Sequence, residues 1–484
     1  MIQYTEGVSP ESSSQRHEAW LPQQGLQLSD RRRLLLVGDL LTVSAAAELA
    51  LWLGTLTSGE IFSTLGLHNR HAWLFGLVPL WILLHTHLYD LHTASLITRT
   101  LRELLRNLGL ALGLYLGLYF LAPLGALPRL VMLYFLAGAF FFTVVWRLVY
   151  IHVFAGPHFK IRTLVVGAGR AGEIITTTLT QLYPSQYLIA GLIDDNPDKV
   201  GRALGNIPIL GGHRYLLEAA KNHRVSEIIL AITGEIQGGM FQALLDCQEY
   251  GLHITRMPML YEQLTRQVPI HHLDADWIMT AFVDTVRPNN IYRVLCRALD
   301  LIIAALGLSL LVCLFPWLAI LIWIESGRPI IYRQIRAGRG GRAFTMLKFR
   351  TMIPGAEVDS QPRWATETDP RITRVGWFLR RTRLDEIPQF WNVFKGEMSL
   401  VGPRPERPGF IGLLEKQIPF YRARLLVKPG LTGWAQINYG YANSVEHAMT
   451  KLQYDLYYIK HQSLWLDLLI LLRTIGVIIK FQGI

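Results

Sequence analysis

Long apolar runs separated by short polar stretches dominate the first 155 residues. Four runs, each long enough to cross a lipid bilayer as a helix, lie at residues 34–56, 72–89, 108–125 and 128–154. The residues before the first run are polar and rich in Gln and Ser, a composition typical of disorder. The pattern therefore predicts a disordered tail over residues 1–30 and a four-helix transmembrane bundle over residues 31–155.

The positions of the arginines predict how this bundle is oriented. Arg31 to Arg33 precede the first run, Arg99 to Arg106 lie between the second and third, and Arg147 closes the fourth. Basic residues favour the cytoplasmic side, so both ends of the bundle are expected there. A cleaved signal peptide is the alternative for the first run, because Ala45 to Ala47 resemble a cleavage site. Cleavage would place the arginine-rich loop outside, which argues against it.

The pattern changes to that of an α/β domain over residues 156–255. Short apolar segments at 162–166, 187–193 and 227–232 read as strands, and the first is followed by Gly-Ala-Gly-Arg-Ala-Gly at 167–172 and a helical stretch. Glycines at these positions allow a tight turn and a close backbone approach to phosphate at a helix N-terminus. The order of elements predicts a Rossmann-like fold.

This domain supplies a candidate nucleotide site. Its members are the three glycines of the turn and an acidic residue about twenty positions further on, namely Gly167, Gly169, Gly172 and Asp194. A domain that has kept the turn and binds no nucleotide is the other interpretation. The residues leave both open.

A fifth apolar run follows a Pro-containing linker predicted over residues 256–292. It covers residues 298–324, and arginines flank it on both sides, so both flanks favour the cytoplasmic face. Pro316 lies inside the run, where proline breaks or kinks a helix. These features predict a re-entrant helix that enters and leaves the membrane on the same side. A fifth full span that tolerates the proline is the alternative.

Composition supports a membrane protein with a basic soluble part. Charged residues make up 17% of the 484 residues, against about 25% in soluble domains. The net charge is +11, and residues 325–440 hold 20 Lys and Arg against 10 Asp and Glu. A basic region of this kind suits anionic lipid or phosphate ligands, and no nucleic-acid motif is found. The three cysteines have no metal-binding spacing.

The candidate chemistry lies after residue 330, where many cations surround few carboxylates. The adjacent Asp385 and Glu386 follow Arg380, Arg381 and Arg383. A carboxylate among arginines stays ionised and can serve as a nucleophile or as a Mg²⁺ ligand. Phosphoryl transfer uses cations, a divalent metal and an oxygen nucleophile. A surface helix with salt bridges is the alternative at this stage.

Five motifs carry a resemblance to a known family. They are KFRTM at 348–352, DPRIT at 369–373, LDEIPQ at 384–389, MSLVGPRP at 398–405 and KPGLTGWAQ at 428–436. Residues 293–484 resemble the bacterial sugar transferases, the monotopic polyprenyl-phosphate phosphoglycosyl transferases. The whole chain resembles their long form, with four spans, a Rossmann-like middle domain and a mainly α catalytic domain with a re-entrant helix at 298–324. Residues 464–479 read as an amphipathic helix that suits the membrane surface, with a core helix as the alternative.

The resemblance implies an activity and a set of roles. It implies transfer of hexose-1-phosphate from a UDP-sugar, with UDP-glucose favoured, to undecaprenyl phosphate in exopolysaccharide or O-antigen assembly. Asp385 is expected as the nucleophile that forms a phosphosugar intermediate, with Glu386 beside it and Mg²⁺ bridging this dyad and the diphosphate. The expected substrate-binding residues are basic, namely Lys348, Arg350, Arg371, Arg381, Arg404 and Lys428. In the family the residue before the helix-breaking proline is usually Ser, whereas Phe315 precedes Pro316 here.

The implied setting is the bacterial inner membrane, with the soluble domains in the cytoplasm. Expected partners are the UDP-sugar, undecaprenyl phosphate, the bilayer, downstream glycosyltransferases and a second copy of the chain as a homodimer. One rival function is a membrane-bound nucleotide-sugar dehydratase or epimerase, which needs a Tyr-x-x-x-Lys pair, and no tyrosine here has lysine four residues on. A membrane-anchored nucleotide sensor without enzymatic activity is the second rival.

Overall fold

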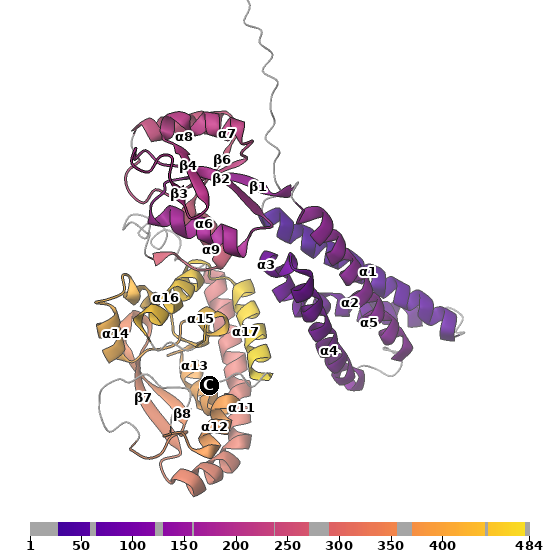
Figure 1. The fold of residues 1–484 in the computed structure, drawn as a ribbon. Helices are drawn as coiled ribbons and strands as arrows, with labels where there is room; N and C mark the ends of the chain where they lie inside the picture. The colour runs from indigo at the N-terminus through magenta and orange to yellow at the C-terminus, as the bar shows by residue number, and fades with distance from the viewer. Residues whose placement is uncertain are drawn as a thin grey trace, which may run out of the picture. The chain divides into compact units, whose positions relative to one another are not determined.

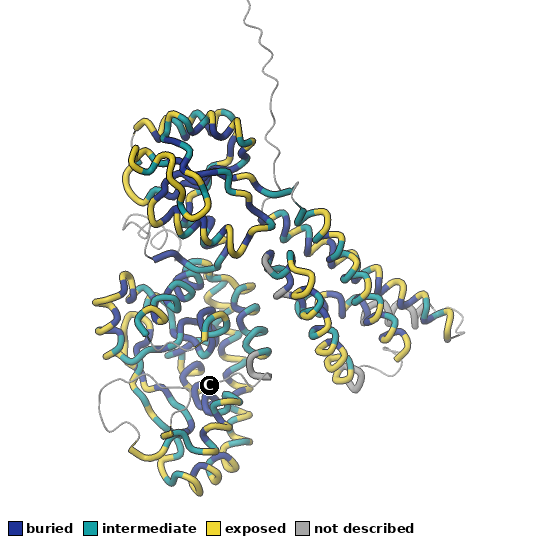
Figure 2. Tube along the Cα trace, viewed as in Figure 1, coloured by how far each residue is buried: buried dark blue, intermediate teal, exposed yellow. Residues whose placement is uncertain are grey.

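The computed structural model describes most of the chain and divides it into two compact units. The described residues are 28–58, 64–121, 129–156, 159–236, 238–270, 290–355, 370–440 and 444–479. The first unit comprises Met1–Met257 and the second Pro258–Ile484. Figure 1 shows the elements of both units and Figure 2 shows which residues are buried. The predicted tail lies outside the described residues up to residue 27, and its last residues begin the first helix.

The first unit begins with long apolar helices. These are α1 (Leu28–Ser58), α2 (Thr64–Leu84), α4 (Ile97–Leu121) and α5 (Arg129–Val149), with the short η1 (Thr86–Tyr89) and α3 (Leu91–Ala94) between α2 and α4 and the π-helix η2 (Tyr150–Phe154) after α5. Small buried residues of α1, among them Ala46 and Ala50, belong to the core that this helix shares with α5. A buried ion pair joins the same two helices, with Arg147 Nη2 2.5 Å from Asp39 Oδ2.

Apolar helices in both units indicate association with a membrane. By length and composition, three stretches of the described chain qualify as spans, Leu28–Thr57, Arg129–Phe154 and Asn290–Ser326, and Leu74–Leu84 is a shorter apolar segment. The four helices expected for the bundle are present. The first and the fourth meet this criterion, so crossing by the other two stays a prediction.

The predicted α/β domain is confirmed. Its strands are β1 (Ile161–Val166), β2 (Tyr187–Ile193), β3 (Ala203–Leu204), β4 (Ile207–Gly211), β5 (Glu227–Leu230) and β6 (His253–Arg256), and its helices are α6 (Arg170–Leu182), η4 (His213–Tyr215), α7 (Leu216–Asn222) and α8 (Gly238–Glu249). The sheet order is β3-β4-β2-β1-β5-β6, parallel except for the β3–β4 pair. The parallel strands thus follow the order third, second, first, fourth, fifth, as in a Rossmann-type sheet.

The second unit is mainly helical with short sheets. Its elements are α11 (Asn290–Ser326), β7 (Ile331–Ala337), η6 (Arg339–Gly341), β8 (Ala343–Phe349), α12 (Arg374–Arg381), η7 (Leu384–Gln389), α13 (Phe390–Lys395), β9 (Ser399–Val401), α14 (Pro408–Leu414), η8 (Tyr421–Leu426), β10 (Gly430–Thr432), α15 (Trp434–Asn438), α16 (Val445–Lys460) and α17 (Leu464–Ile479). β7 and β8 form an antiparallel hairpin, and β9 pairs with β10 in parallel.

The predicted linker over 256–292 is wrong in its first part. Residues 257–265 form α9 (Met257–Thr265), and the next residues enter the core of the second unit. Val268 and Ile270 are fully buried there, and the Val268 N–H donates to Gln453 O at 3.1 Å. Apolar residues at intervals in this stretch bury it despite its two prolines. Residues 271–289 lie outside the described residues.

The apolar run predicted as re-entrant forms α11, and Pro316 does not interrupt it. Figure 1 shows the helix bending toward its C-terminal end. Large apolar side chains along it are exposed, including Val312, Trp317 and Ile324. Ala304 packs in the main core of the second unit, and Leu318 packs with Phe349 and Leu379.

Helix α17 presents an apolar face outward, but its acidic residue points inward. Trp465 and Ile475 are exposed, whereas Asp467 is 4% exposed. The Asp467 carboxylate accepts hydrogen bonds from the Tyr292 hydroxyl at 2.7 Å and the Tyr458 hydroxyl at 2.9 Å. An acid in an amphipathic surface helix would be expected on its polar face. Its burial instead ties α17 to α11 and α16.

Candidate active site

The dyad Asp385-Glu386 lies on η7, a short 3-10 helix that starts abruptly after α12. Arg383, the residue before it, has φ of +59°, in the left-handed region that is uncommon for residues other than glycine. This turn separates η7 from α12. Asp385 and Glu386 are 6% and 8% exposed, so both carboxylates are largely removed from water, and a buried charge requires compensation.

Glu386 receives that compensation from three cations. Lys348 Nζ donates to Glu386 Oε1 at 3.0 Å and Arg404 Nη2 donates to the same oxygen at 2.8 Å. Arg383 Nη1 lies 3.7 Å from Oε2. Burial alone would favour the neutral acid, but the three cations outweigh it and hold the pKa of Glu386 well below its ordinary value. Glu386 is therefore a fixed, ionised carboxylate.

Asp385 lies beside the same lysine as Glu386 but is not hydrogen-bonded to it. Lys348 Nζ lies 3.8 Å from Asp385 Oδ2, beyond hydrogen-bond distance, and no residue in the described part of the chain donates a hydrogen bond to this carboxylate. Burial raises the pKa of Asp385, and the charge of Lys348 opposes that shift. Its oxygens thus stay available for a reaction partner beside several cations.

Lys348 is held in place by the strand that carries it and by a buried amide. It lies on β8, opposite Tyr332 on β7. Asn392 of α13 accepts a hydrogen bond from Leu347 N at 3.2 Å and donates to Thr345 O at 2.8 Å. This amide joins β8 to the helix that follows the dyad, so the lysine and the carboxylates are fixed relative to each other.

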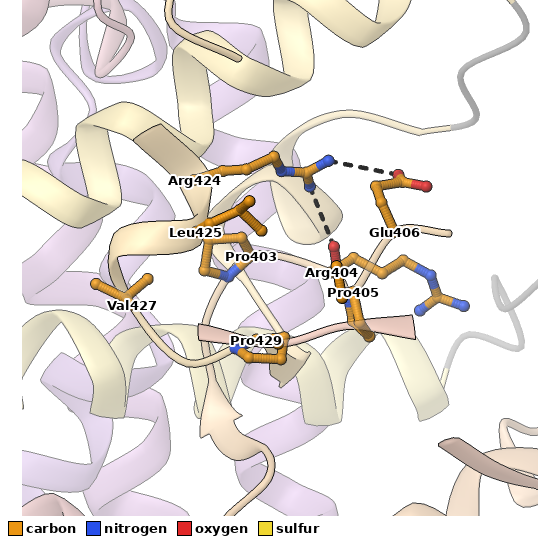
Figure 3. Close-up of a pocket in the computed structure, with 10 residues that line it drawn as sticks. Pro403, Arg404, Pro405, Glu406, Arg424, Leu425, Val427 and Pro429 are labelled. Carbon is orange, nitrogen blue, oxygen red and sulfur yellow. Dashed lines mark hydrogen bonds and ion pairs between the residues drawn. The ribbon is translucent and has the colours of Figure 1, made fainter. Parts of the chain in front are cut away.

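Arg404 reaches the dyad from the loop after β9. Its side chain is 41% exposed, so the guanidinium bonds Glu386 and still faces solvent. A shallow pocket beside this loop is shown in Figure 3. Its lining comes from β7, the arginine loop and the segment after α14, namely Ala337, Gly338, Pro403, Arg404, Pro405, Glu406, Arg424, Leu425, Val427 and Pro429.

The structure brings together four of the predicted site residues: Lys348, Asp385, Glu386 and Arg404. The other four make contacts of their own. Arg350 Nη1 donates to Ser326 O at 3.2 Å and so caps α11. The carbonyl of Arg371 accepts from Ile353 N at 2.9 Å, the exposed Arg381 stacks over the Trp377 ring at 5.0 Å, and the charged neighbours of Lys428 are Arg297, Asp300 and Arg339.

Arg380 and Arg383 are site residues that the sequence analysis missed. Arg380 Nε donates to Thr351 Oγ1 at 2.9 Å, and its charge acts on Asp385 to lower the pKa. Helical spacing could have identified Arg380. Gly376 and Leu379 form the buried face of α12, and a position four residues further on lies on the same face. Arg380 satisfies that spacing from Gly376, whereas Arg381 falls outside it. Arg383 lies beyond the end of α12, in the left-handed turn, so no helical spacing points to it.

The predicted nucleotide site in the first unit forms the expected turn. Gly167 has φ of +106°, and a Cβ at Gly172 would collide with the Gly167 carbonyl. The Asp194 carboxylate accepts hydrogen bonds from Ala168 N at 2.7 Å and from Lys199 Nζ at 2.9 Å. It therefore stabilises the glycine turn itself. A Cβ at Gly169 would meet no other atom within 4 Å, and nucleotide binding there stays a prediction.

No metal centre is formed by protein ligands alone in the described part of the chain. Among the described residues there is no group of three or more His, Cys, Asp or Glu side chains that could hold a metal ion. The dyad offers two adjacent carboxylates. That number suits Mg²⁺, which is usually held by one or two carboxylates together with water and substrate phosphates.

Two family models match this chain. The family model described as bacterial sugar transferase matches residues 291–481, and one described as CoA-binding domain matches residues 85–258. A UDP-galactose-lipid carrier transferase from Erwinia amylovora is 31% identical over 67% of this chain and 69% of its own length. The chain belongs to the bacterial sugar transferase family.

Two further relatives differ in the sugar that they are named for. A UDP-N-acetylgalactosamine-undecaprenyl-phosphate N-acetylgalactosaminephosphotransferase from Aeromonas hydrophila is 38% identical over 51% of this chain. A UDP-glucose:undecaprenyl-phosphate glucose-1-phosphate transferase from Xanthomonas campestris pv. campestris is 36% identical over 55% of this chain. The matches span 57% and 56% of the lengths of these two proteins.

Proposed function

We propose that this chain transfers a sugar 1-phosphate from a UDP-sugar to undecaprenyl phosphate and releases UMP. The observation that carries the proposal is the buried Asp385-Glu386 dyad under Lys348 and Arg404, inside the segment that matches the sugar transferase family. Asp385 has cations nearby but, among the described residues, no hydrogen bond to any of them. Such a carboxylate suits a nucleophile that attacks a diphosphate, because the cations can bind the phosphate oxygens. The names of the relatives support the choice of both substrates.

Asp385 is the nucleophile in this proposal, and the geometry supports the choice over its neighbour. Both Lys348 and Arg404 donate to Glu386 Oε1, so the negative charge of Glu386 is already neutralised by bonded cations, which makes it the weaker nucleophile of the two. An Asp385 oxygen attacks the β-phosphorus of the UDP-sugar, and the bond from this phosphorus to the oxygen that leaves with UMP breaks. A phosphate oxygen of undecaprenyl phosphate then attacks the same phosphorus and restores the Asp385 carboxylate.

The basic residues serve the phosphates in both steps. Lys348 and Arg404 can bind the diphosphate oxygens while they hold Glu386 ionised. Asp385 and Glu386 would hold Mg²⁺, which when bound supplies charge neutralisation at the diphosphate. Two adjacent carboxylates as ligands, with cations nearby to bind the phosphates, support Mg²⁺ as the cofactor.

The two ends of α11 support a re-entrant path. At its N-terminal end, Arg297 Nη1 donates to Val393 O at 2.8 Å. At its C-terminal end, the Glu325 carboxylate accepts from Arg374 N at 2.7 Å and from Val375 N at 2.8 Å. Both ends are thus bonded to the same compact unit, while apolar side chains between them are exposed. A helix that crossed the bilayer would separate its ends by about 30 Å of hydrocarbon.

On a re-entrant path the dyad would lie at the cytoplasmic face of a bacterial inner membrane. In the same proposal, α1, α2, α4 and α5 are four membrane spans. UDP-glucose is the first sugar donor to test, because several relatives are named for glucose. Initiation of exopolysaccharide or O-antigen repeat units follows from the same reaction. A homodimer and downstream glycosyltransferases stay predictions.

The test is UMP release from membranes that contain the chain, undecaprenyl phosphate and Mg²⁺, with UDP-glucose, UDP-galactose and UDP-N-acetylgalactosamine in parallel. Asp385→Asn should reduce the rate by orders of magnitude and leave the amount of folded protein unchanged. Glu415→Gln, which changes an exposed acid of the same unit, is the matched control. Activity of Asp385→Asn within about tenfold of wild type would exclude Asp385 as the nucleophile.

A further inference from the structure

The loop that carries Arg404 has few donors with which to hold itself in place. Residues 402–407 lie outside helices and strands. Two of them, Pro403 and Pro405, have no amide N–H to donate. The loop must therefore be fixed mainly through its carbonyl oxygens, and each of four consecutive carbonyls, from Pro403 to Glu406, accepts a hydrogen bond.

The outer two carbonyls are bound by backbone amides. Pro403 O accepts from Gly430 N at 2.9 Å, and Glu406 O accepts from Ala337 N at 2.9 Å. These bonds join the ends of the loop to the first residue of β10 and to the last residue of β7. They resemble the bonds between strands, and they leave the two carbonyls next to the site without a backbone donor.

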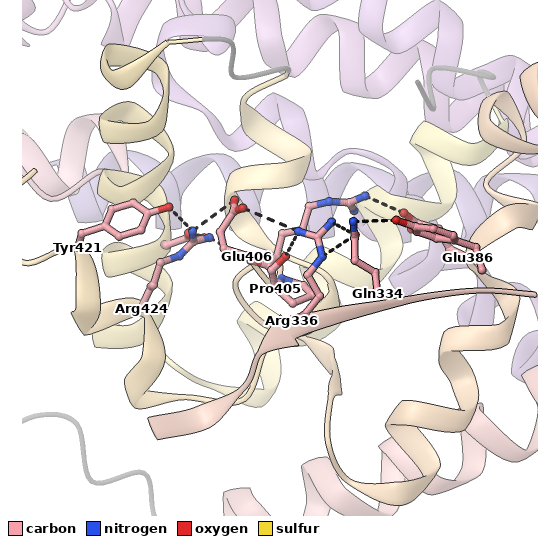
Figure 4. Close-up of polar contacts among 10 residues, drawn as sticks. Gln334, Arg336, Glu386, Pro405, Glu406, Tyr421 and Arg424 are labelled. Carbon is pink, nitrogen blue, oxygen red and sulfur yellow. Dashed lines mark hydrogen bonds and ion pairs between the residues drawn. The ribbon is translucent and has the colours of Figure 1, made fainter. Parts of the chain in front are cut away.

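The inner two carbonyls are bound by arginine side chains. Arg424 Nη2 donates to Arg404 O at 3.1 Å, and Arg336 Nη1 donates to Pro405 O at 3.0 Å. Guanidinium groups suit this task because each carries five N–H donors in a rigid plane. The two arginines come from η8 and β7, on either side of the loop (Figure 4).

Arg424 is itself fixed by neighbours in the core. Its Nη1 donates to the Tyr421 hydroxyl at 2.7 Å, and its Nη2 donates to Asp455 Oδ2 at 2.9 Å. The side chain is 7% exposed. A buried guanidinium with these partners has little freedom to move.

Arg336 is fixed by its own strand and by the loop. Its Nε and Nη2 both donate to Gln334 Oε1, at 3.0 Å and 2.6 Å. The carboxylate of Glu406 lies between the two arginines, 3.9 Å from Arg336 Nη1 and 3.5 Å from Arg424 Nη1. Figure 4 shows this line of contacts from Tyr421 to Glu386.

We propose that Arg336 and Arg424 are positioning residues for the transfer reaction, which rests on the function proposed above. They hold the carbonyls of Arg404 and Pro405, and so they fix the backbone from which the Arg404 side chain reaches Glu386 and the diphosphate. A partly exposed arginine keeps rotamer freedom of its own. A rigid backbone limits the positions that its guanidinium samples, and displacement of a substrate-binding group by about 1 Å can cost about 100-fold in rate.

Arg336 gives the sharper test because Arg424 is more deeply embedded in the core. The experiment measures UMP release by the full chain in membranes for wild type, Arg336→Gln, Arg404→Ala and the double variant. Arg336→Gln should lower kcat by about tenfold or more in the wild-type background. In the Arg404→Ala background the same change should cost less than about twofold, because the residue that it positions is already gone. Arg333→Gln, an exposed arginine on the same strand, is the matched control and should change nothing.

Losses of equal size in both backgrounds, or no loss in either, would overturn the positioning role. If Arg336→Gln does not fold, Gln334→Ala removes the acceptor that aligns Arg336, and the same cycle with Arg404→Ala decides the question. A wild-type chain that releases no UMP overturns the proposed function and the inference together. If the wild type is active and Arg336→Gln lowers the rate by the same factor with and without Arg404→Ala, only the inference is overturned.

Discussion

Residues 258–270 should be a structural part of the catalytic unit, although the family match begins at residue 291. Val268 and Ile270 are 0% and 2% exposed and belong to its main core. Complete burial of such a side chain contributes about 1.5–3 kcal/mol. Removing both therefore costs about 3–6 kcal/mol, a large part of the roughly 5–15 kcal/mol that stabilises a whole domain.

Polar contacts of the same stretch add to this cost. Trp434, which is 1% exposed, donates from Nε1 to Arg266 O at 3.2 Å. Losing the acceptor leaves a buried donor unsatisfied, at about 1–3 kcal/mol. Lys460 Nζ also loses both oxygens of Glu262, at 3.0 Å and 2.9 Å.

The assay compares thermal unfolding in detergent of two shortened chains, one starting at residue 258 and one at residue 291. For domains of this size, 1 kcal/mol corresponds to about 2–4 °C in Tm. The apolar loss alone thus predicts that the shorter chain melts about 6–24 °C lower. The chain starting at 258 with Val268→Ala is the intermediate control. Equal melting temperatures for the two shortened chains would refute the reasoning and restore this stretch as a linker.

Two further predictions separate residues that look alike in the sequence. Gly172→Val should unfold the α/β domain, because its side chain would collide with the Gly167 carbonyl. Gly169→Ala should leave the protease resistance of the domain unchanged. A domain that is more protease-sensitive with Gly169→Ala than with Gly172→Val would contradict this geometry. Arg380→Gln should lower UMP release by about tenfold, since a charge that acts on Asp385 is lost, while Arg381→Gln should stay within about twofold. A larger effect at Arg381 would show that the helix face has been assigned wrongly.

Much of the α/β domain could be predicted because its signals are local. The strand expected at 187–193 is β2 with the same bounds, and that expected at 227–232 is β5, which ends at Leu230. An apolar run of this length between turn residues is a strand signal that needs no tertiary information. The glycine turn fixed the order of the first strand and helix for the same reason.

The linker prediction failed because burial is decided by distant partners. Residues 258–270 contain two prolines and have no strong period, which reads as a connection. Their apolar side chains are nevertheless buried by α15 and α16, which lie more than 160 residues further along the chain. A pattern within the stretch cannot reveal a groove formed elsewhere.

The roles of the arginines in the site could not be predicted from the sequence either. Composition located the basic region correctly, but it could not separate a guanidinium that binds phosphate from one that supports a loop or caps a helix. Lys348 and Arg404 reach the dyad from β8 and from the loop after β9, and the charge of Arg380 acts on Asp385 from α12. Each of these three side chains is held by different residues. An amide on α13 holds the strand of Lys348, two arginines hold the loop of Arg404, and a threonine accepts the Arg380 hydrogen bond. Under the proposed function, some arginines bind the substrate phosphates and others hold those arginines in place, and only their contacts tell the two groups apart.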